Sequence, residues 1–136
     1  DSSVGERPGL SKGEMDVARV LWEIGASATV RDVHERLKET REIDFTTVQT
    51  YLRRLHSKGY ASSKLKGRAR YYSARTKART VIRETVDDLI ERLFGGDSMP
   101  LARHLIEERG IDADGLAELR DLIDRLESEK GTNRDA

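Results

Sequence analysis

The sequence predicts a mainly helical fold that carries one small β-hairpin. Apolar residues recur at helical spacing in six separate stretches of the chain. Between the third and fourth stretches, residues 60–73 read as two short strands around a glycine. The chain has 136 residues, of which 36% are hydrophobic and 37% charged. It is therefore long enough for one compact domain with an appendage, or for two very small domains with modest cores.

The chain opens with a polar segment and a well-marked first helix. Residues 1–9 are polar with one proline and two glycines, and are predicted to form a flexible tail. Ser11 and Glu14 stand three residues apart, which is the spacing of a capping box. Gly25 is a plausible end for this helix.

Two further helices follow. Thr29 begins the second with the same kind of capping signal, and the helix is expected to end near Thr40. Asp44 and Thr46 are equally good starts for the third, which Gly59 closes. Apolar side chains from these three helices are expected to form one small core: Leu10, Trp22, Val33, Leu37, Val48, Leu52 and Leu55.

The hairpin is predicted from strands at residues 60–65 and 69–73. Gly67 supplies a left-handed turn position at low cost. Tyr71 and Tyr72 must face opposite sides of the second strand, so one of them should pack inward.

The C-terminal part is predicted to be helical. A long helix spans residues 76–94, Gly95 and Gly96 break it, a short helix follows Pro100, and Asp112 caps the last one. Residues 131–136 are expected to form a flexible tail.

These C-terminal helices have apolar stripes that a single chain would cover poorly, which favours a helical dimerisation region at residues 76–130. The expected dimer contacts are Val86, Leu89, Ile90, Leu93, Leu105, Leu116, Leu119, Ile123 and Leu126.

Charge is unevenly placed although the net charge is zero. Residues 1–40 carry a net charge of −2, residues 41–80 carry +9, and residues 81–136 carry −7. A basic block followed by an acidic one suggests that one part meets phosphates and the other meets protein or water.

The third helix and the hairpin together have the layout of a winged helix-turn-helix, at residues 10–75. Thr47, Thr50 and Arg54 share one helical face, flanked by Gln49 and Arg53. Arginine suits guanine, glutamine suits adenine, and threonine suits a phosphate or a thymine methyl group. Such a face predicts reading of the DNA major groove.

The hairpin carries four basic residues, Lys64, Lys66, Arg68 and Arg70, nominally on one side. They fit a wing that grips the DNA backbone, although a basic hairpin alone could equally be a solubilising edge. Base contacts are expected from Arg54, Thr47, Thr50 and Gln49, and phosphate contacts from Arg31, Arg53, Lys58, Lys66, Arg68 and Arg70. Thr46 is a further candidate DNA contact.

Other functional classes find little support. The three histidines lie on separate elements, the chain has no cysteine, and no nucleotide-binding or hydrolase motif occurs. We therefore expect no enzyme activity, no cofactor and no metal. No apolar run could span a bilayer, so a cytoplasmic protein is expected. The remaining alternative is a winged helix that binds another protein without sequence-specific DNA binding.

Four segments resemble the penicillinase and methicillin-resistance repressor family: LSKGEMDVARVLWEIG, TVRDVHERL, DFTTVQTYLRRLHSKGY and GRARYYSA. The resemblance extends from Leu10 to about Glu127. It implies a homodimeric winged-helix repressor that binds a palindromic operator, often of β-lactamase or related genes. It also implies that Thr47, Thr50 and Arg54 lie on the recognition helix.

The resemblance further implies a route of induction. In well-known members a sensor-protease pathway cuts an Asn-Phe bond in the helix after the long one. His104 and Leu105 occupy the corresponding place, so the sequence departs from that pattern. A copper-responsive branch of the family uses a cysteine cluster, which this chain lacks.

Overall fold

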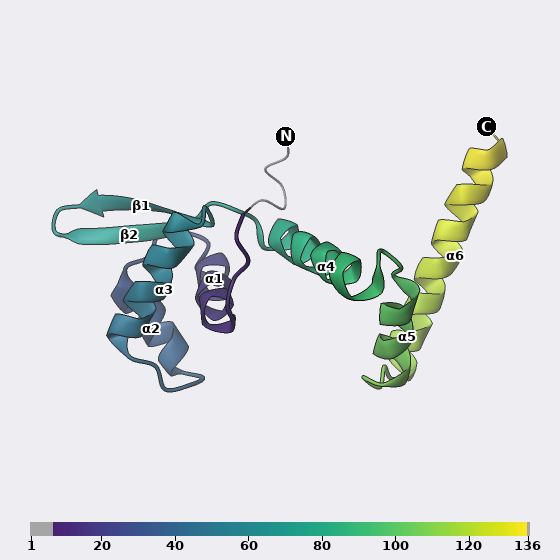
Figure 1. The fold of residues 1–136 in the computed structure, drawn as a ribbon, viewed down its shortest axis with the longest axis horizontal. Helices are drawn as coiled ribbons and strands as arrows, with labels where there is room; N and C mark the ends of the chain where they lie inside the picture. Colours follow the sequence, from purple (N-terminus) through teal and green to yellow (C-terminus); the bar gives the residue numbers. More distant parts are fainter. Residues whose placement is uncertain (1–6, 136) are drawn as a thin grey trace. The chain divides into compact units, whose positions relative to one another are not determined.

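The computed structural model describes the backbone of residues 7–135 and side chains through residue 131. The described chain forms six α-helices and one two-stranded sheet (Figure 1). It divides into two compact units between Asp88 and Leu89, within the fourth helix. The elements are α1 (Lys12–Ile24), α2 (Val30–Lys38), α3 (Phe45–Ser57), β1 (Ala61–Lys66), β2 (Ala69–Ala74), α4 (Ala78–Phe94), α5 (Met99–Glu107) and α6 (Ala113–Asp135).

Side-chain caps begin the first two helices, as the sequence predicts. The Ser11 hydroxyl accepts from the Glu14 amide at 3.2 Å, and the Glu14 carboxylate accepts from the Ser11 amide at 2.9 Å. Thr29 forms the same reciprocal box at the start of α2. Asp44 occupies the N-cap position of α3, but its side chain makes no capping hydrogen bond.

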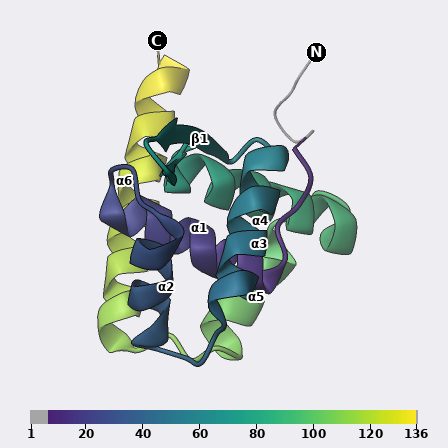
Figure 2. The ribbon, with the colours of Figure 1, turned by 90° about the vertical axis from the view of Figure 1, so that its left-hand side faces the viewer.

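The helices α1, α2 and α3 lie together (Figure 2), and their apolar side chains form one small core. Of the seven predicted core residues, Leu10 and Trp22 are only partly buried and pack against the core from outside. The Trp22 indole donates to the carbonyl of Thr76 at 2.9 Å, which links α1 to the segment before α4. The buried side chains from the three helices include Val17, Ala18, Val20, Leu21, Val33, Leu37, Val48, Leu52 and Leu55.

A close approach between α1 and α3 explains a glycine inside a helix. A Cβ atom at Gly13 would lie 2.4 Å from the ring of Tyr51. Glycine costs about 0.5–1 kcal/mol relative to alanine within a helix. Here its missing side chain leaves room for the aromatic ring.

The hairpin is antiparallel, with Lys66 opposite Ala69 and Leu65 opposite Arg70. Directly opposite residues share a face, so the two-residue turn places Arg70 on the face away from Lys66. The expectation that all four basic residues lie on one side is therefore wrong for Arg70. The positive φ of 63° at Gly67 confirms the predicted turn.

The base of the hairpin joins the core. Tyr72 is buried and Tyr71 half-buried, which confirms that one of the pair packs inward. Ala28, between α1 and α2, exchanges two backbone hydrogen bonds with Tyr72 at 2.8 and 2.7 Å. The root of the wing is thereby fixed to the segment that precedes α2.

The segment before α1 differs from the predicted flexible tail. Arg7 donates to both carboxylate oxygens of Glu84 on α4, at 2.9 and 3.1 Å. Its guanidinium also lies 5.4 Å from the centre of the Tyr60 ring, and the Tyr60 hydroxyl donates to the carbonyl of Pro8 at 2.6 Å. The predicted tail at residues 1–6 lies outside the described residues.

The second unit contains the end of α4 with α5 and α6. Gly95 and Gly96 have φ of 60° and 91°, in the predicted helix break. Asp112 accepts from the amide of Gly115 at 2.9 Å, which confirms the predicted cap. The predicted tail at residues 131–136 is wrong as far as Asp135, because α6 continues to that residue; residue 136 lies outside the described part.

Apolar stripes on these helices are left uncovered. Among the described side chains beyond Val81, none is buried. The nine residues predicted for dimerisation are exposed or half-buried, including Leu93 at 67% exposure and Ile123 at 53%. Among the described helices, none is long and apolar enough to cross a membrane.

Glu14 is the one charged residue among the buried side chains described, at 2% exposure. Besides capping α1, it accepts from the Lys58 ammonium at 2.6 Å, at the end of α3. The same ammonium donates to the carbonyl of Gly9 at 2.9 Å. Burial raises the pKa of Glu14, but the hydrogen bonds from Lys58 and Ser11 and the Lys58 charge outweigh it and hold the pKa below its ordinary value.

We predict that Glu14→Gln lowers the free energy of unfolding by about 2 kcal/mol at neutral pH, because a charged hydrogen bond in a buried site is lost. A lowered folded pKa contributes stability above the unfolded pKa, near 4.3, and loses it as pH falls through the folded pKa. The difference between the two proteins should therefore shrink in acid.

Chemical denaturation at several pH values measures this difference. Glu23→Gln is a matched control, because Glu23 pairs with Arg36 at 3.3 Å on the exposed surface. That change should alter stability by less than about 1 kcal/mol. Equal losses in the two variants would contradict a special role for Glu14.

Candidate nucleic-acid interface

The outward face of α3 carries the predicted base-reading residues. Its buried edge is made by Val48, Leu52 and Leu55, so the opposite side turns away from the core. On that side, the exposed residues are Thr46, Arg53 and Arg54. The half-buried ones are Thr47, Gln49 and Thr50.

Thr50 has a restricted hydrogen-bonding role. Its hydroxyl donates to the carbonyl of Thr46 at 3.0 Å, one turn earlier in the helix. The single hydroxyl proton is thus engaged, and the methyl group and the oxygen lone pairs remain for a ligand. This arrangement suits a thymine methyl or a base amino group better than a phosphate oxygen.

The cations at the end of α3 have different environments. Arg53 is exposed and makes no ion pair with any side chain described. Arg54 is 58% exposed and approaches Glu14 no closer than 4.0 Å. Lys58 donates to Glu14 and Gly9, and the phosphate contact expected of it from the sequence stays a prediction.

The hairpin extends away from the three helices (Figure 1). Lys64, Lys66, Arg68 and Arg70 are all exposed. The Lys66 ammonium lies 5.5 Å from the centre of the Tyr71 ring, whereas Arg70 donates to the Ser63 hydroxyl at 2.9 Å. The wing therefore presents cations on both faces and at its tip.

Three arginines on α2 and in the turn after it differ in whether they have an ion-pair partner. Arg31 is exposed in the first turn of α2 and has no ion pair among the described side chains. Arg36 pairs with Glu23, and Arg41 pairs with Asp16 at 2.6 Å. Of these three, Arg31 keeps its charge available for an anion.

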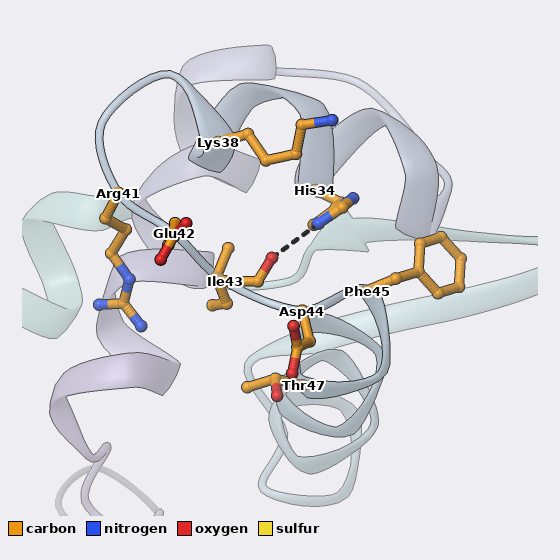
Figure 3. Close-up of a pocket in the computed structure, with 8 residues that line it drawn as sticks. All are labelled: His34, Lys38, Arg41, Glu42, Ile43, Asp44, Phe45 and Thr47. Atoms are coloured by element: carbon orange, nitrogen blue, oxygen red, sulfur yellow. Dashed lines mark hydrogen bonds between the residues drawn. The ribbon is translucent and has the colours of Figure 1, made fainter.

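The turn between α2 and α3 contains a contact that the sequence analysis missed. His34 donates through Nε2 to the carbonyl of Ile43 at 2.8 Å. The Phe45 ring stands edge-on to the His34 ring, with centroids 5.7 Å apart and planes at 84° (Figure 3). These groups border an open hollow of about 810 Å³ lined by His34, Lys38, Arg41, Glu42, Ile43, Asp44, Phe45 and Thr47. In the sequence, the aromatic Phe45 beside a predicted helix start was the one sign that could have pointed to this contact.

Within residues 7–131, no three His, Asp or Glu side chains gather as they would around a metal ion. The groups that the fold brings together are instead hydrogen-bond donors, cations and a few apolar side chains on α3 and the hairpin. Such a surface is chemically suited to bases and phosphates.

Comparison with known proteins gives a consistent result. The family model described as penicillinase repressor matches residues 10–125. The penicillinase repressor of Staphylococcus aureus is 21% identical over 117 residues, covering 86% of this chain and 92% of that protein. The transcriptional regulator BlaI of Mycobacterium tuberculosis is 35% identical over 98 residues, covering 71% of each.

A solved structure of a RosR complex has the same fold, with a TM-score of 0.55 and 13% identity over 94% of this chain and 98% of that one. The fold is thus a winged helix with a helical C-terminal region. Since the family model covers most of its length, the chain belongs to the penicillinase repressor family.

Proposed function

We propose that the chain is a transcriptional repressor that binds double-stranded DNA as a homodimer. The observation that carries the proposal is the outward face of α3, with exposed and half-buried hydrogen-bonding side chains, beside an exposed basic hairpin. The named relatives, a penicillinase repressor and a transcriptional regulator, support the same function. The dimer would repress transcription by occupying a promoter, for example that of a β-lactamase gene or another resistance gene.

In this proposal α3 lies in the major groove and the hairpin grips the backbone. Arg54 reads guanine, Gln49 reads adenine, and Thr50 offers its methyl group to thymine. Thr46 and Thr47 lie near the helix N-terminus, where the helix dipole favours contact with a phosphate. Phosphate contacts come from Arg31, Arg53, Lys66, Arg68 and Arg70, with Lys58 as a further contact that already holds Glu14.

Dimerisation is proposed through the C-terminal helices. Exposed apolar stripes on α4, α5 and α6 support it, because a small helical unit without buried side chains has too little core to be stable alone. A two-fold dimer presents two recognition helices to two half-sites, one helical turn or a multiple apart.

Release from DNA is proposed to involve a sensor protease that cuts at His104 and Leu105. The bond lies within α5, and Leu105 is 42% exposed. A helix must open locally before a protease can cut it. The absence of buried side chains in α5 supports such opening at low cost.

Selection of bound fragments from the native genome, followed by gel shifts at several salt concentrations, tests the proposal. We expect a near-palindromic site whose affinity falls steeply with salt. A protein with no affinity for any duplex in dilute buffer would instead favour a winged helix that binds other proteins.

We predict that Arg54→Ala costs about 1–3 kcal/mol on the selected site and relaxes the preference at one base pair, because a bidentate guanine contact is lost. Binding competition between the selected site and random DNA measures the effect. An equal loss on both would rule out a base-reading role. Arg19→Ala is a control, since Arg19 pairs with Asp16 at 3.1 Å on α1.

We predict that Arg68→Ala weakens binding to all duplexes by a similar factor, because a turn residue of the wing contacts phosphate. The slope of log affinity against log salt should decrease in magnitude by about 1. Titrations at four salt concentrations give this slope. If the slope does not change, Arg68 does not contact phosphate.

We predict that Leu119→Asp converts the dimer to monomers, because it places a charge in the apolar stripe of α6. Sedimentation velocity measures the change. Ala117→Asp is the control: this exposed residue lies off the stripe and should leave the dimer intact. A persistent Leu119→Asp dimer would place the interface elsewhere.

A further inference from the structure

Phe45 is the first residue of α3, the helix proposed to enter the major groove. It is 44% exposed, and nothing in the core requires a phenyl ring at this position. Gln49, one turn further, lies on the same stripe of α3. Phe45 is therefore the N-terminal tip of α3, next to Thr46 and at the edge of the reading face that Gln49 occupies; its stem lies on the core side, above Val48.

His34 holds the Phe45 ring in place. Its hydrogen bond to Ile43 fixes the imidazole against the turn, and the edge of one ring meets the face of the other (Figure 3). An aromatic side chain has few rotatable bonds, and a neighbouring ring restricts them further. Little conformational entropy would then be lost when the exposed part of Phe45 contacts a ligand.

The major groove has one apolar group, the C5-methyl of thymine. Arg54 and Gln49 can distinguish guanine and adenine but gain little from this methyl group, and the small methyl of Thr50 covers only part of it. A rigid, partly exposed phenyl ring at the end of the reading face has the complementary chemistry, because packing on the methyl removes apolar surface from water.

We propose that Phe45 determines specificity by packing on a thymine methyl in each half-site, with His34 as its positioning residue. This inference rests on the proposed function, because it requires α3 to enter the major groove. It adds an apolar contact to the hydrogen-bonding contacts from Arg54 and Gln49.

The test replaces each thymine of the selected site by deoxyuridine, one at a time, which removes only the methyl group. For the wild-type protein, one replacement per half-site should weaken binding about fourfold, the value of one buried methyl-sized group. Phe45→Ala should bind the thymine and deoxyuridine sites equally at that position. Ile82→Ala, at an exposed residue of α4, should behave like the wild type.

His34→Gln removes the ring but keeps a donor for the Ile43 carbonyl. This variant should show a weaker preference for thymine over deoxyuridine at the same position. Its thermal unfolding, and its preference at the base pair that Arg54 is proposed to read, should stay unchanged. A purely structural role for His34 would instead weaken binding at every position.

The outcomes are separable. A fourfold effect that disappears only in Phe45→Ala supports the inference. A wild type that binds its site but senses no thymine methyl through Phe45 overturns it, and a uniform loss in Phe45→Ala would indicate contact with sugar. A wild type that binds no duplex would defeat the proposed function itself, and the inference with it.

Discussion

The arrangement of α1 and α3 in the first unit depends on one buried carboxylate, that of Glu14. Glu14 is closed to solvent, so its charge must be compensated within the protein. It accepts from the Ser11 amide at the start of α1 and from Lys58 at the end of α3, and Lys58 also reaches Gly9. Through these bonds, Glu14 and Lys58 tie α1, α3 and the segment before α1 together. The apolar core can hold α3 near α1. The directional hydrogen bonds at the end of α3 then restrict how far α3 can rotate or slide against α1.

The same pair matters for electrostatics near the proposed DNA surface. Lys58 and Arg54 lie four residues apart, and both are on the Glu14 side of α3. Lys58 neutralises the carboxylate at close range, so Arg54, at 4.0 Å and largely solvated, is held only weakly. An uncompensated Glu14 would repel phosphates and attract the guanidinium away from the groove. The close contact of Lys58 with Glu14 therefore leaves the more exposed Arg54 available.

Whether a contact could be predicted from the sequence depends on how far apart its two residues lie along the chain. The two capping boxes span three residues each, and they were predicted correctly because the pattern and the contact are local. The face of Arg70 depends on the number of turn residues, which a basic alternating pattern does not reveal. The partners of Lys58 and Arg7 lie 44 and 77 residues away, and no local signal marks them. Phe45 was missed because its importance depends on a histidine from the preceding helix.

The uncovered C-terminal helices link assembly to the proposed binding. A single recognition helix with a short wing offers few contacts, whereas two linked copies bind the second half-site at a high effective concentration. The net charge of −7 over residues 81–136 disfavours contact of this region with DNA, which is consistent with the proposed use of its apolar stripes in a dimer. Loss of the dimer would then reduce operator binding without altering any DNA contact. In the proposed route of release, a cut in α5 would therefore relieve repression although α5 lies outside the unit that contains α3 and the hairpin.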